Sequence, residues 1–462
     1  MSATEICGLH RVLNRARPAS RSEQSDTFSA QSTTGGIYLA GRYGLGVLVS
    51  LGNMLVMTCW IGPHAYGLFV TGMGFVACLA AMARGGVDTY LIRNEEAPNG
   101  RMYAVAATFV LIASIGLAIA GAGAIPLLTR WYGNAEFVPA YGVLLGSIPM
   151  AGLTGVPMAK LERALNFRSV ATIEGGGQLA GLVVSAFLAW AKAGVWAAVA
   201  GQITSQAFTF VSAMLASSLA FRLCLDVKQM RRMLSYGAGL TASQRVWQLR
   251  TLVSPLLVGR FAGADAVAYV ALAARIAEAL GTLRLAAGRI VIAALARLQE
   301  QKHQFQTALE RALLLQVVTL GPLLCGVALL GPFLLSRLLG VRWTASLLVY
   351  PFIAAGVLVN SIYNLQASAL FVVGKQWVVL RWYTVHLVLL STITLVLLPR
   401  LGILGYGWAE LLACVAYVGI HRSLGRVATI SYRQLGICMA VFLPLLFAIP
   451  GCRFVLRIIA ST

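Results

Sequence analysis

Long apolar stretches separated by short polar breaks run along the chain from about residue 36 onward. A helix needs about 20 predominantly apolar residues to cross a bilayer, and thirteen stretches reach or approach that length. They cover residues 36–60, 66–92, 103–128, 138–160, 169–191, 194–220, 234–261, 266–293, 310–331, 345–373, 378–399, 401–421 and 435–458. The pattern predicts an all-α polytopic membrane protein with about 12–14 transmembrane helices.

The composition supports this prediction. Of the 462 residues, 59% are apolar and only 11% are charged, whereas soluble domains are about 25% charged. A water-soluble globule and a large catalytic domain outside the membrane are therefore excluded. The eight cysteines and five histidines are scattered and lack the close spacing of metal or redox motifs. We expect no catalytic residues, no metal site and no cofactor.

Basic residues outnumber acidic ones, 36 against 15, which gives a net charge of +21. Lys and Arg collect in the cytoplasmic loops of membrane proteins. If the N-terminus is cytoplasmic, 21 basic residues fall in the tail and the even-numbered loops, and six fall in the odd-numbered loops. This bias predicts a cytoplasmic N-terminus. Residues 1–35, rich in Ser, Thr, Arg and Gln, are expected to form a disordered cytoplasmic tail.

A weak internal repeat divides the chain. The segments GPHAYGLF at 62–69 and GADAVAYV at 263–270 lie 201 residues apart, and in both a tight turn leads into an apolar helix. Six helices per half give both halves the same topology, so a pseudo-two-fold axis along the membrane normal would relate them. We expect an N-terminal six-helix lobe, a cytoplasmic linker, a C-terminal six-helix lobe and an extra C-terminal helix, at 36–220, 221–233, 234–421 and 422–462.

Nine basic residues remain once the tail and loop residues are set aside, and two of them, Arg453 and Arg457, belong to the last and weakest span. The other seven are arginines inside the predicted spans, where a charge costs about 2.5 kcal/mol or more and usually marks a pathway or a partner. Those near mid-depth are Arg245, Arg250 and Arg275. The other four lie near the cytoplasmic ends of their spans, so their side chains can also snorkel to the surface. These four are Arg42, Arg84, Arg284 and Arg289.

Two of these arginines have an acidic neighbour in the sequence. Asp88 follows Arg84 by four residues and Glu278 follows Arg275 by three, so each pair is expected to meet along its own helix. In the span 234–261, five polar residues fall on one helix face, which must be turned away from lipid. They are Thr241, Gln244, Arg245, Gln248 and Thr251. Together these features predict an arginine-ringed cavity between the halves, for a cargo bearing phosphate or diphosphate.

Five short motifs, in order along the chain, resemble those of one family. They are WIGPHAYGLF at 60–69, GGVDTYLIR at 85–93, ERALNFR at 162–168, GVWAAVAGQ at 194–202 and VGRFAG at 258–263. The sequence is similar, over roughly residues 36–425, to the bacterial oligosaccharide flippases (Wzx-like). That family belongs to the multidrug/oligosaccharidyl-lipid/polysaccharide exporter superfamily.

The resemblance implies two six-helix lobes with extra C-terminal helices, in a bacterial inner membrane. It implies a flippase that moves a polyprenyl-diphosphate-linked oligosaccharide by alternating access, for exopolysaccharide, O-antigen or capsule synthesis. The seven arginines would bind the diphosphate, and the polymerase and glycosyltransferases of the same pathway are the candidate protein partners. Three acidic residues would couple an ion or balance the arginines, and no nucleic acid is expected to bind. These acidic residues are Asp88, Glu174 and Glu278.

Other functions fit the sequence less well. A multidrug exporter of the same superfamily would need an acidic cavity for cationic drugs, whereas the charges here are basic. A membrane-embedded glycosyltransferase or polymerase needs catalytic groups in large outer loops, and no predicted outer loop exceeds about fifteen residues. A purely structural membrane protein would not retain so many buried arginines. The chain has no G-x-x-x-x-G-K-[ST] segment, so direct use of ATP is not expected.

Overall fold

A computed structural model describes residues 46, 49, 52–94, 96, 98–219, 222–281, 302–425 and 430–448. Helices make up nearly all of these ranges, and no strand occurs within them. The expected all-α fold is thereby confirmed. The expected tail at 1–35, together with Arg42, Arg284 and Arg289, lies outside the described residues.

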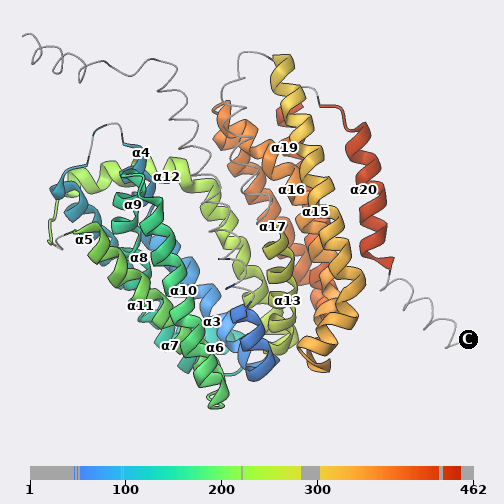
Figure 1. Cartoon of the computed structure of the whole chain (residues 1–462), viewed down its shortest axis with the longest axis horizontal. Coiled ribbons are helices and arrows are strands. Elements are labelled where there is room, and N and C mark those ends of the chain that lie inside the picture. Colours follow the sequence, from blue (N-terminus) through green and yellow to red (C-terminus); the bar gives the residue numbers. More distant parts are fainter. Residues whose placement is uncertain are drawn as a thin grey trace, which may run out of the picture. The chain divides into compact units, whose positions relative to one another are not determined.

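The first half of the chain consists of a short helix, Gly52–Ile61, followed by α3 to α11 (Figure 1). These helices are α3 (Pro63–Arg84), α4 (Val87–Arg93), α5 (Gly100–Gly123), α6 (Ile125–Tyr132), α7 (Val138–Leu145), α8 (Ile148–Leu153), α9 (Gly155–Arg163), α10 (Phe167–Trp190) and α11 (Val195–Ser217). Two predicted spans are interrupted. The span 66–92 breaks where Gly85 and Gly86 adopt φ of 60° and 80°, and the span 138–160 bends by 42° between α7 and α8.

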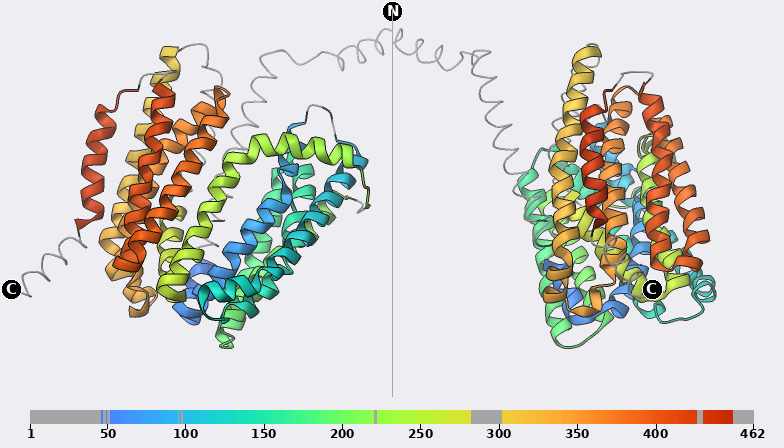
Figure 2. Two further views of the ribbon diagram at one scale, coloured as in Figure 1. Left: turned by 180° about the vertical axis from the view of Figure 1, so that it is seen from behind. Right: turned by 90° about the vertical axis from the view of Figure 1, so that its right-hand side faces the viewer.

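The second half begins with two helices that are separated by a short irregular segment. Its helices are α12 (Val227–Leu249), α13 (Gly259–Gly281), α15 (Lys302–Leu338), α16 (Ser346–Val372), α17 (Gln376–Leu401), α18 (Ile403–Ala413), α19 (Val418–Gly425) and α20 (Arg433–Leu446). Figure 2 shows α12 changing direction along its length, between the helices of the two halves. The short 3₁₀ helix η1 (Arg250–Leu252) and the π-helical turn η2 (Ser254–Val258) separate α12 from α13.

Eight described helices are long and apolar enough to cross a membrane, and a ninth counts if the bent pair from 138 to 163 is one span. One of the eight, Thr241–Gly281, is not a single straight helix, because it kinks at Gly263, with φ 83° and ψ 175°, between the predicted spans 234–261 and 266–293. The 23-residue α11 is of similar length but is not one of the eight. The chain is thus a multi-pass membrane protein.

The turns of the proposed repeat share one backbone conformation. Gly62 has φ 83° and ψ 167°, and Gly263, 201 residues later, has φ 83° and ψ 175°. A second pair of glycines also matches, since Gly194 before α11 has φ 59° and ψ −130° and Gly402 before α18 has φ 58° and ψ −142°. These positive φ angles are readily adopted only by glycine. The turn after the first helix of each half, and a later turn before α11 in the first half and before α18 in the second, therefore have matching conformations.

The two repeat turns also touch. A Cβ atom on Gly67 would overlap the backbone carbonyl of Ala264, so α3 and α13 approach each other through bare backbone. Next to this contact, His64 lies 3.4 Å from the Asp265 carboxylate and 3.0 Å from that of Glu136. His64 and Asp265 occupy equivalent positions of the repeat. The halves are thus held together at the end of the bundle where these turns lie.

Gly67 offers a direct test of this contact. Gly67→Ala should lower the free energy of unfolding by about 1–3 kcal/mol, because the added methyl group has no space beside Ala264. Gly116→Ala on α5 is the matched control, since nothing lies within 4 Å of a Cβ placed there. The measurement is the thermal midpoint of each purified variant in detergent. Equal midpoints for the two variants would contradict the close packing.

Candidate functional site

A polar cavity of about 330 Å³ lies among Gly52–Ile61, α3, α10, α11 and α13. We call it the central cavity, because α13 belongs to the second half and the other helices to the first. Apolar side chains, among them Met57 and Phe69, line part of its wall. The polar groups of the lining belong to Asn53, Tyr66, Gln178, Gln202, Ser205 and Arg275.

Helix periodicity explains why these residues meet. Ala198, Gly201, Gln202 and Ser205 have the i, i+3, i+4, i+7 spacing of a single face of α11. Gly181 of α10 packs against the backbone of Gly201, where a Cβ would lie 2.7 Å from the carbonyl oxygen. Without side chains at these two glycines, the helices pack closely. The amide-bearing faces of α10 and α11 are thereby brought side by side.

The chemistry of the central cavity is that of neutral hydrogen-bonding groups around one cation. Carboxamides both donate and accept hydrogen bonds, and the buried Oδ1 atom of Asn53 has no partner among the described residues. Arg275 is exposed and is the one charged side chain among the described residues that line the cavity. Such a lining suits a hydroxyl-rich ligand with an anionic group.

A second cavity, of about 180 Å³, lies within the second half. Its wall includes Trp247, Arg250, Glu278, Asn360 and His386. The break between α12 and α13 places Arg250 there. Pro255 lies within η2 and lacks the backbone N–H of a regular helix. The chain accordingly leaves the α-helical path at Arg250 and resumes it at Gly259.

Arg250 is held by a buried carboxylate. Its Nη2 atom lies 2.6 Å from Oε2 of Glu410 on α18, and its guanidinium stacks over the Trp247 ring at 4.9 Å. The Tyr406 hydroxyl donates a hydrogen bond of 2.6 Å to the other Glu410 oxygen. Because Glu410 is 5% exposed, water screens this ion pair little, and the pair ties the broken helix to α18.

A chain of polar contacts continues from this pair. His386 Nδ1 donates to the carbonyl oxygen of Ala413 at 3.0 Å, and its ring stacks on that of Tyr417 at 4.6 Å. The Tyr417 hydroxyl lies 3.3 Å from His386 Nε2 and accepts a hydrogen bond of 3.0 Å from Asn360. These contacts link α16, α17 and the 3₁₀ turn η4 (Cys414–Tyr417).

The pairing of Arg84 with Asp88 expected along one helix is not found. The reason is the break at Gly85 and Gly86, which puts Arg84 at the end of α3 and Asp88 at the start of α4. Arg84 donates instead to the Ala151 carbonyl at 3.4 Å, and Asp88 accepts from the Thr89 N–H at 2.8 Å. Asp88 lies near enough to Arg245 for its charge to act on that guanidinium.

The expected pair of Arg275 and Glu278 is not formed either, among the ion pairs of the described residues. Both side chains are exposed on α13, but Arg275 lines the central cavity and Glu278 lines the second cavity. The helix therefore separates the two charges between two spaces. Glu174 is half-buried on α10.

The five polar residues predicted to share one face of the span 234–261 differ in their exposure. Thr241 is buried, Gln244 and Thr251 are exposed, and Gln248 is half-buried. This polar face does not continue past Leu249 as part of an α-helix, because η1 begins at Arg250. The Nη2 atom of Arg245 is buried without a hydrogen-bond partner in the described part of the chain.

Sequence reasoning missed two groups of residues. The amides of the central cavity carry no charge, so charge alone does not reveal them, although the two glutamines and three hydroxyl residues within 202–209 give a usable signal. Glu410 was missed because 160 residues separate it from Arg250. Within the described ranges, no three His, Cys, Asp or Glu side chains gather in a way that could hold a metal ion.

Known structures share this fold. The structure of the lipid II flippase MurJ in an inward closed conformation matches with a TM-score of 0.73 at 14% identity, covering 91% of this chain and 93% of that one. An inward-facing multidrug resistance MATE family transporter of the MOP superfamily matches with 0.68 at 14% identity, covering 83% and 95%. A MOP superfamily transporter from Pyrococcus furiosus matches with 0.59 at 15% identity, covering 85% and 96%. The fold is therefore the two-lobed transporter fold of this superfamily.

A family profile gives a more specific classification than the shared fold. The profile of the family described as "Polysaccharide biosynthesis protein" matches residues 56–348, which is more than half of the chain. The chain belongs to this family of polysaccharide biosynthesis proteins, and the resemblance to Wzx-like flippases is confirmed. No protein of curated function matches the sequence.

The ion pair of the second cavity gives a test of its structural role. Glu410→Ala should destabilise the protein by about 3–5 kcal/mol, because it leaves the Arg250 guanidinium buried without its counter-charge. The double variant Arg250→Met with Glu410→Leu should recover most of this loss. Thermal unfolding of the purified variants measures both effects. A double variant less stable than Glu410→Ala would show that the pair contributes more than mutual neutralisation.

Proposed function

We propose that this protein is a flippase that moves a polyprenyl-diphosphate-linked oligosaccharide across the bacterial inner membrane by alternating access. The assembled product would be a surface polysaccharide. The observation that carries the proposal is the lining of the central cavity, where Arg275 stands among neutral amides and hydroxyls. A guanidinium matches phosphate oxygens in a bidentate way, and amides match the donors and acceptors of sugar hydroxyls.

The remaining arginines are assigned by their surroundings. Arg84 and Arg245 lie with Asp88 where α3, α4 and α12 pack together, and we assign them with Arg275 to the path of the diphosphate. Arg42, Arg284 and Arg289 complete the proposed set. We leave Arg250 out, because Glu410 already neutralises it. The candidates for ion coupling or charge balance are Asp88, Glu174 and Glu278.

The contact between α3 and α13 supports a rocking motion. The two halves meet closely at one end of the bundle, through Gly67 and the Ala264 carbonyl and through the hydrogen bond from Trp343 to the Thr58 carbonyl. A fixed contact at this end would let the halves tilt about it. The irregular backbone from 250 to 258 offers a point at which the second half can bend. Each half would tilt about this region, so that the central cavity opens first to one side and then to the other.

The charge distribution supports the orientation. The exposed residues Arg93, Arg168, Lys228 and Arg231 gather at the end of the bundle where α3 ends and α12 begins. We propose that this end is cytoplasmic, as the positive-inside bias requires, and that the N-terminus lies on the same side. Glycosyltransferases there would supply the cargo, and a polymerase on the opposite side would consume it.

The alternative function is export of cationic drugs, as the structural match to a MATE transporter invites. The central cavity argues against it, because no acidic residue appears among the described residues that line it. A cation in this space would meet Arg275 without a counter-charge. The family profile supports the polysaccharide role as well.

Arg275→Ala should abolish export of the surface polysaccharide while the protein remains in the membrane. Loss of one charge-assisted phosphate contact weakens binding by about tenfold to a hundredfold. Arg130→Ala, an exposed arginine of α6, is the control and should export normally. The readout is the amount of polysaccharide at the cell surface, with protein abundance measured in the same membranes. Normal export by Arg275→Ala would overturn the assignment.

Ligand-induced stabilisation separates the two candidate functions. A polyprenyl-diphosphate sugar should raise the thermal midpoint of the purified wild-type protein in detergent, because ligands that bind only the folded state stabilise it. The same lipid should have little effect on Arg275→Ala. A cationic dye should leave both midpoints unchanged. Stabilisation by the dye alone would assign the protein to the drug exporters.

A further inference from the structure

The linker between the two halves, described from Arg222 to Ser235, has two different sides. Residues 222–226 lie in neither a helix nor a strand, and from Leu223 to Val227 exposed and half-buried residues alternate. The backbone N–H of Cys224 donates to the Thr108 hydroxyl at 2.9 Å, and Asp226 caps α12 by accepting from Gln229 N at 3.0 Å. Arg101 holds the same Asp226 carboxylate at 3.4 Å. This side of the linker is fixed to α5.

The other side of the linker is apolar and uncovered. Leu223, Leu225 and Val227 are 70%, 72% and 76% exposed. In the first turns of α12, Lys228, Arg231, Arg232 and Ser235 follow an i, i+3, i+4, i+7 spacing, and all four are exposed. Met233, on the opposite face, is 1% exposed. An apolar edge beside a basic helix face is the pattern of a segment that lies in the headgroup region of a bilayer.

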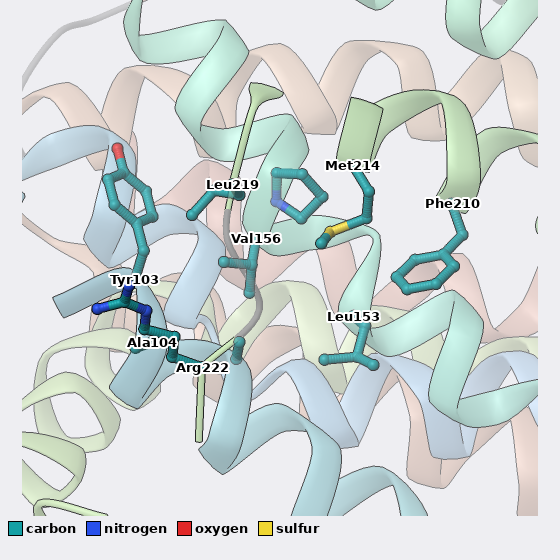
Figure 3. Close-up of a pocket in the computed structure, with 10 residues that line it drawn as sticks. Tyr103, Ala104, Leu153, Val156, Phe210, Met214, Leu219 and Arg222 are labelled. Atoms are coloured by element: carbon teal, nitrogen blue, oxygen red, sulfur yellow. The ribbon is translucent and has the colours of Figure 1, made fainter. Parts of the chain in front are cut away.

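Beside this linker an apolar groove runs along the first half of the chain. A space of about 310 Å³ is lined by apolar side chains alone, from Leu153 of α8 and Phe210, Val211, Met214 and Leu215 of α11. It shares Leu153, Phe210 and Met214 with a small pocket that extends to Leu219 and Arg222. Figure 3 shows Arg222 and Tyr103 on one side of this pocket, with Phe210 and Met214 on the other. We call the two spaces together the linker groove.

We propose that the linker groove binds an anionic phospholipid. One acyl chain would lie along Met214 and Phe210, and Arg222, with Arg231 from α12, would bind the headgroup phosphate. Charge complementarity favours an anionic lipid, because four basic residues lie in this part of the chain, namely Arg222, Lys228, Arg231 and Arg232. The nearby Asp226 carboxylate does not neutralise them, because it pairs with Arg101 and caps α12. The assignment concerns a surface outside the central cavity and does not depend on the proposed cargo.

The lipid would hold the linker against the first half. Because α12 continues from the linker to the broken segment at 250–258, a lipid bound at its start restrains the beginning of the second half. Juxtamembrane basic residues attract anionic headgroups, and each contributes additively to binding.

The test is native mass spectrometry of the full-length protein, titrated with dioleoyl phosphatidylglycerol or dioleoyl phosphatidylcholine. We expect the wild type to retain phosphatidylglycerol in preference to phosphatidylcholine. Arg222→Gln with Arg231→Gln should bind phosphatidylglycerol roughly 30-fold more weakly. Met214→Trp should weaken the binding of both lipids, because the larger side chain would fill the groove. Leu215→Trp, at a 74% exposed position, is a second variant that should block the groove. The matched control, Arg130→Gln with Arg400→Gln, removes the same charge elsewhere and should bind as the wild type does.

Three outcomes would overturn the proposal. Equal retention of the two phospholipids by the wild type would show that the headgroup is not recognised. Undiminished binding by both tryptophan variants would show that the acyl chain does not lie in the groove. Displacement of phosphatidylglycerol by an equal concentration of an unglycosylated polyprenyl diphosphate would assign the groove to a prenyl lipid. Lipid-free thermal midpoints, measured for every variant, separate loss of binding from loss of fold.

Discussion

The backbone contact between Gly67 and Ala264 is the constraint on which the arrangement of the two halves depends. Its closeness fixes α3 against α13 at the turns that follow the first helix of each repeat. Tyr66, beside Gly67, packs edge-on to Trp343 at 5.9 Å, and the Trp343 indole donates to the Thr58 carbonyl at 2.8 Å. The central cavity therefore lies beside a rigid contact, and Arg275 enters it from a helix whose start is anchored.

Three intramembrane arginines in the described part of the chain have different surroundings. Arg250 has a buried carboxylate and an aromatic ring, Arg84 has a backbone carbonyl, and Arg275 faces an open cavity. A charge that is already neutralised can hold helices together but has little left to offer an anion. The division between structural and ligand-binding arginines thus follows from their partners, and Arg275 is the arginine that lines the central cavity among the described residues.

Two different surfaces face the lipid and its headgroups. Along most helices the exposed residues are apolar, as at Ile119 and Phe187, and need only hydrocarbon around them. The linker differs because it combines exposed leucines with a basic helix face. The same linker leads through α12 into the break that positions Arg250. The segment in contact with headgroups and the segment that shapes the second cavity are consequently parts of one continuous element.

The sequence by itself determined the class of this protein, because membrane spans are local. Runs of about 20 apolar residues, the glycines at 62 and 263 and the excess of basic residues each predict a feature without reference to the rest of the chain. Only the tertiary structure decided which charges pair, since Glu410 reaches Arg250 across 160 residues and two glycines separate Asp88 from the helix of Arg84. The neutral amides of the central cavity were likewise hidden, because their role depends on the face that α10 and α11 turn toward Arg275. Helix formation follows from nearby residues, whereas partners and cavities follow from how helices far apart in the sequence pack together.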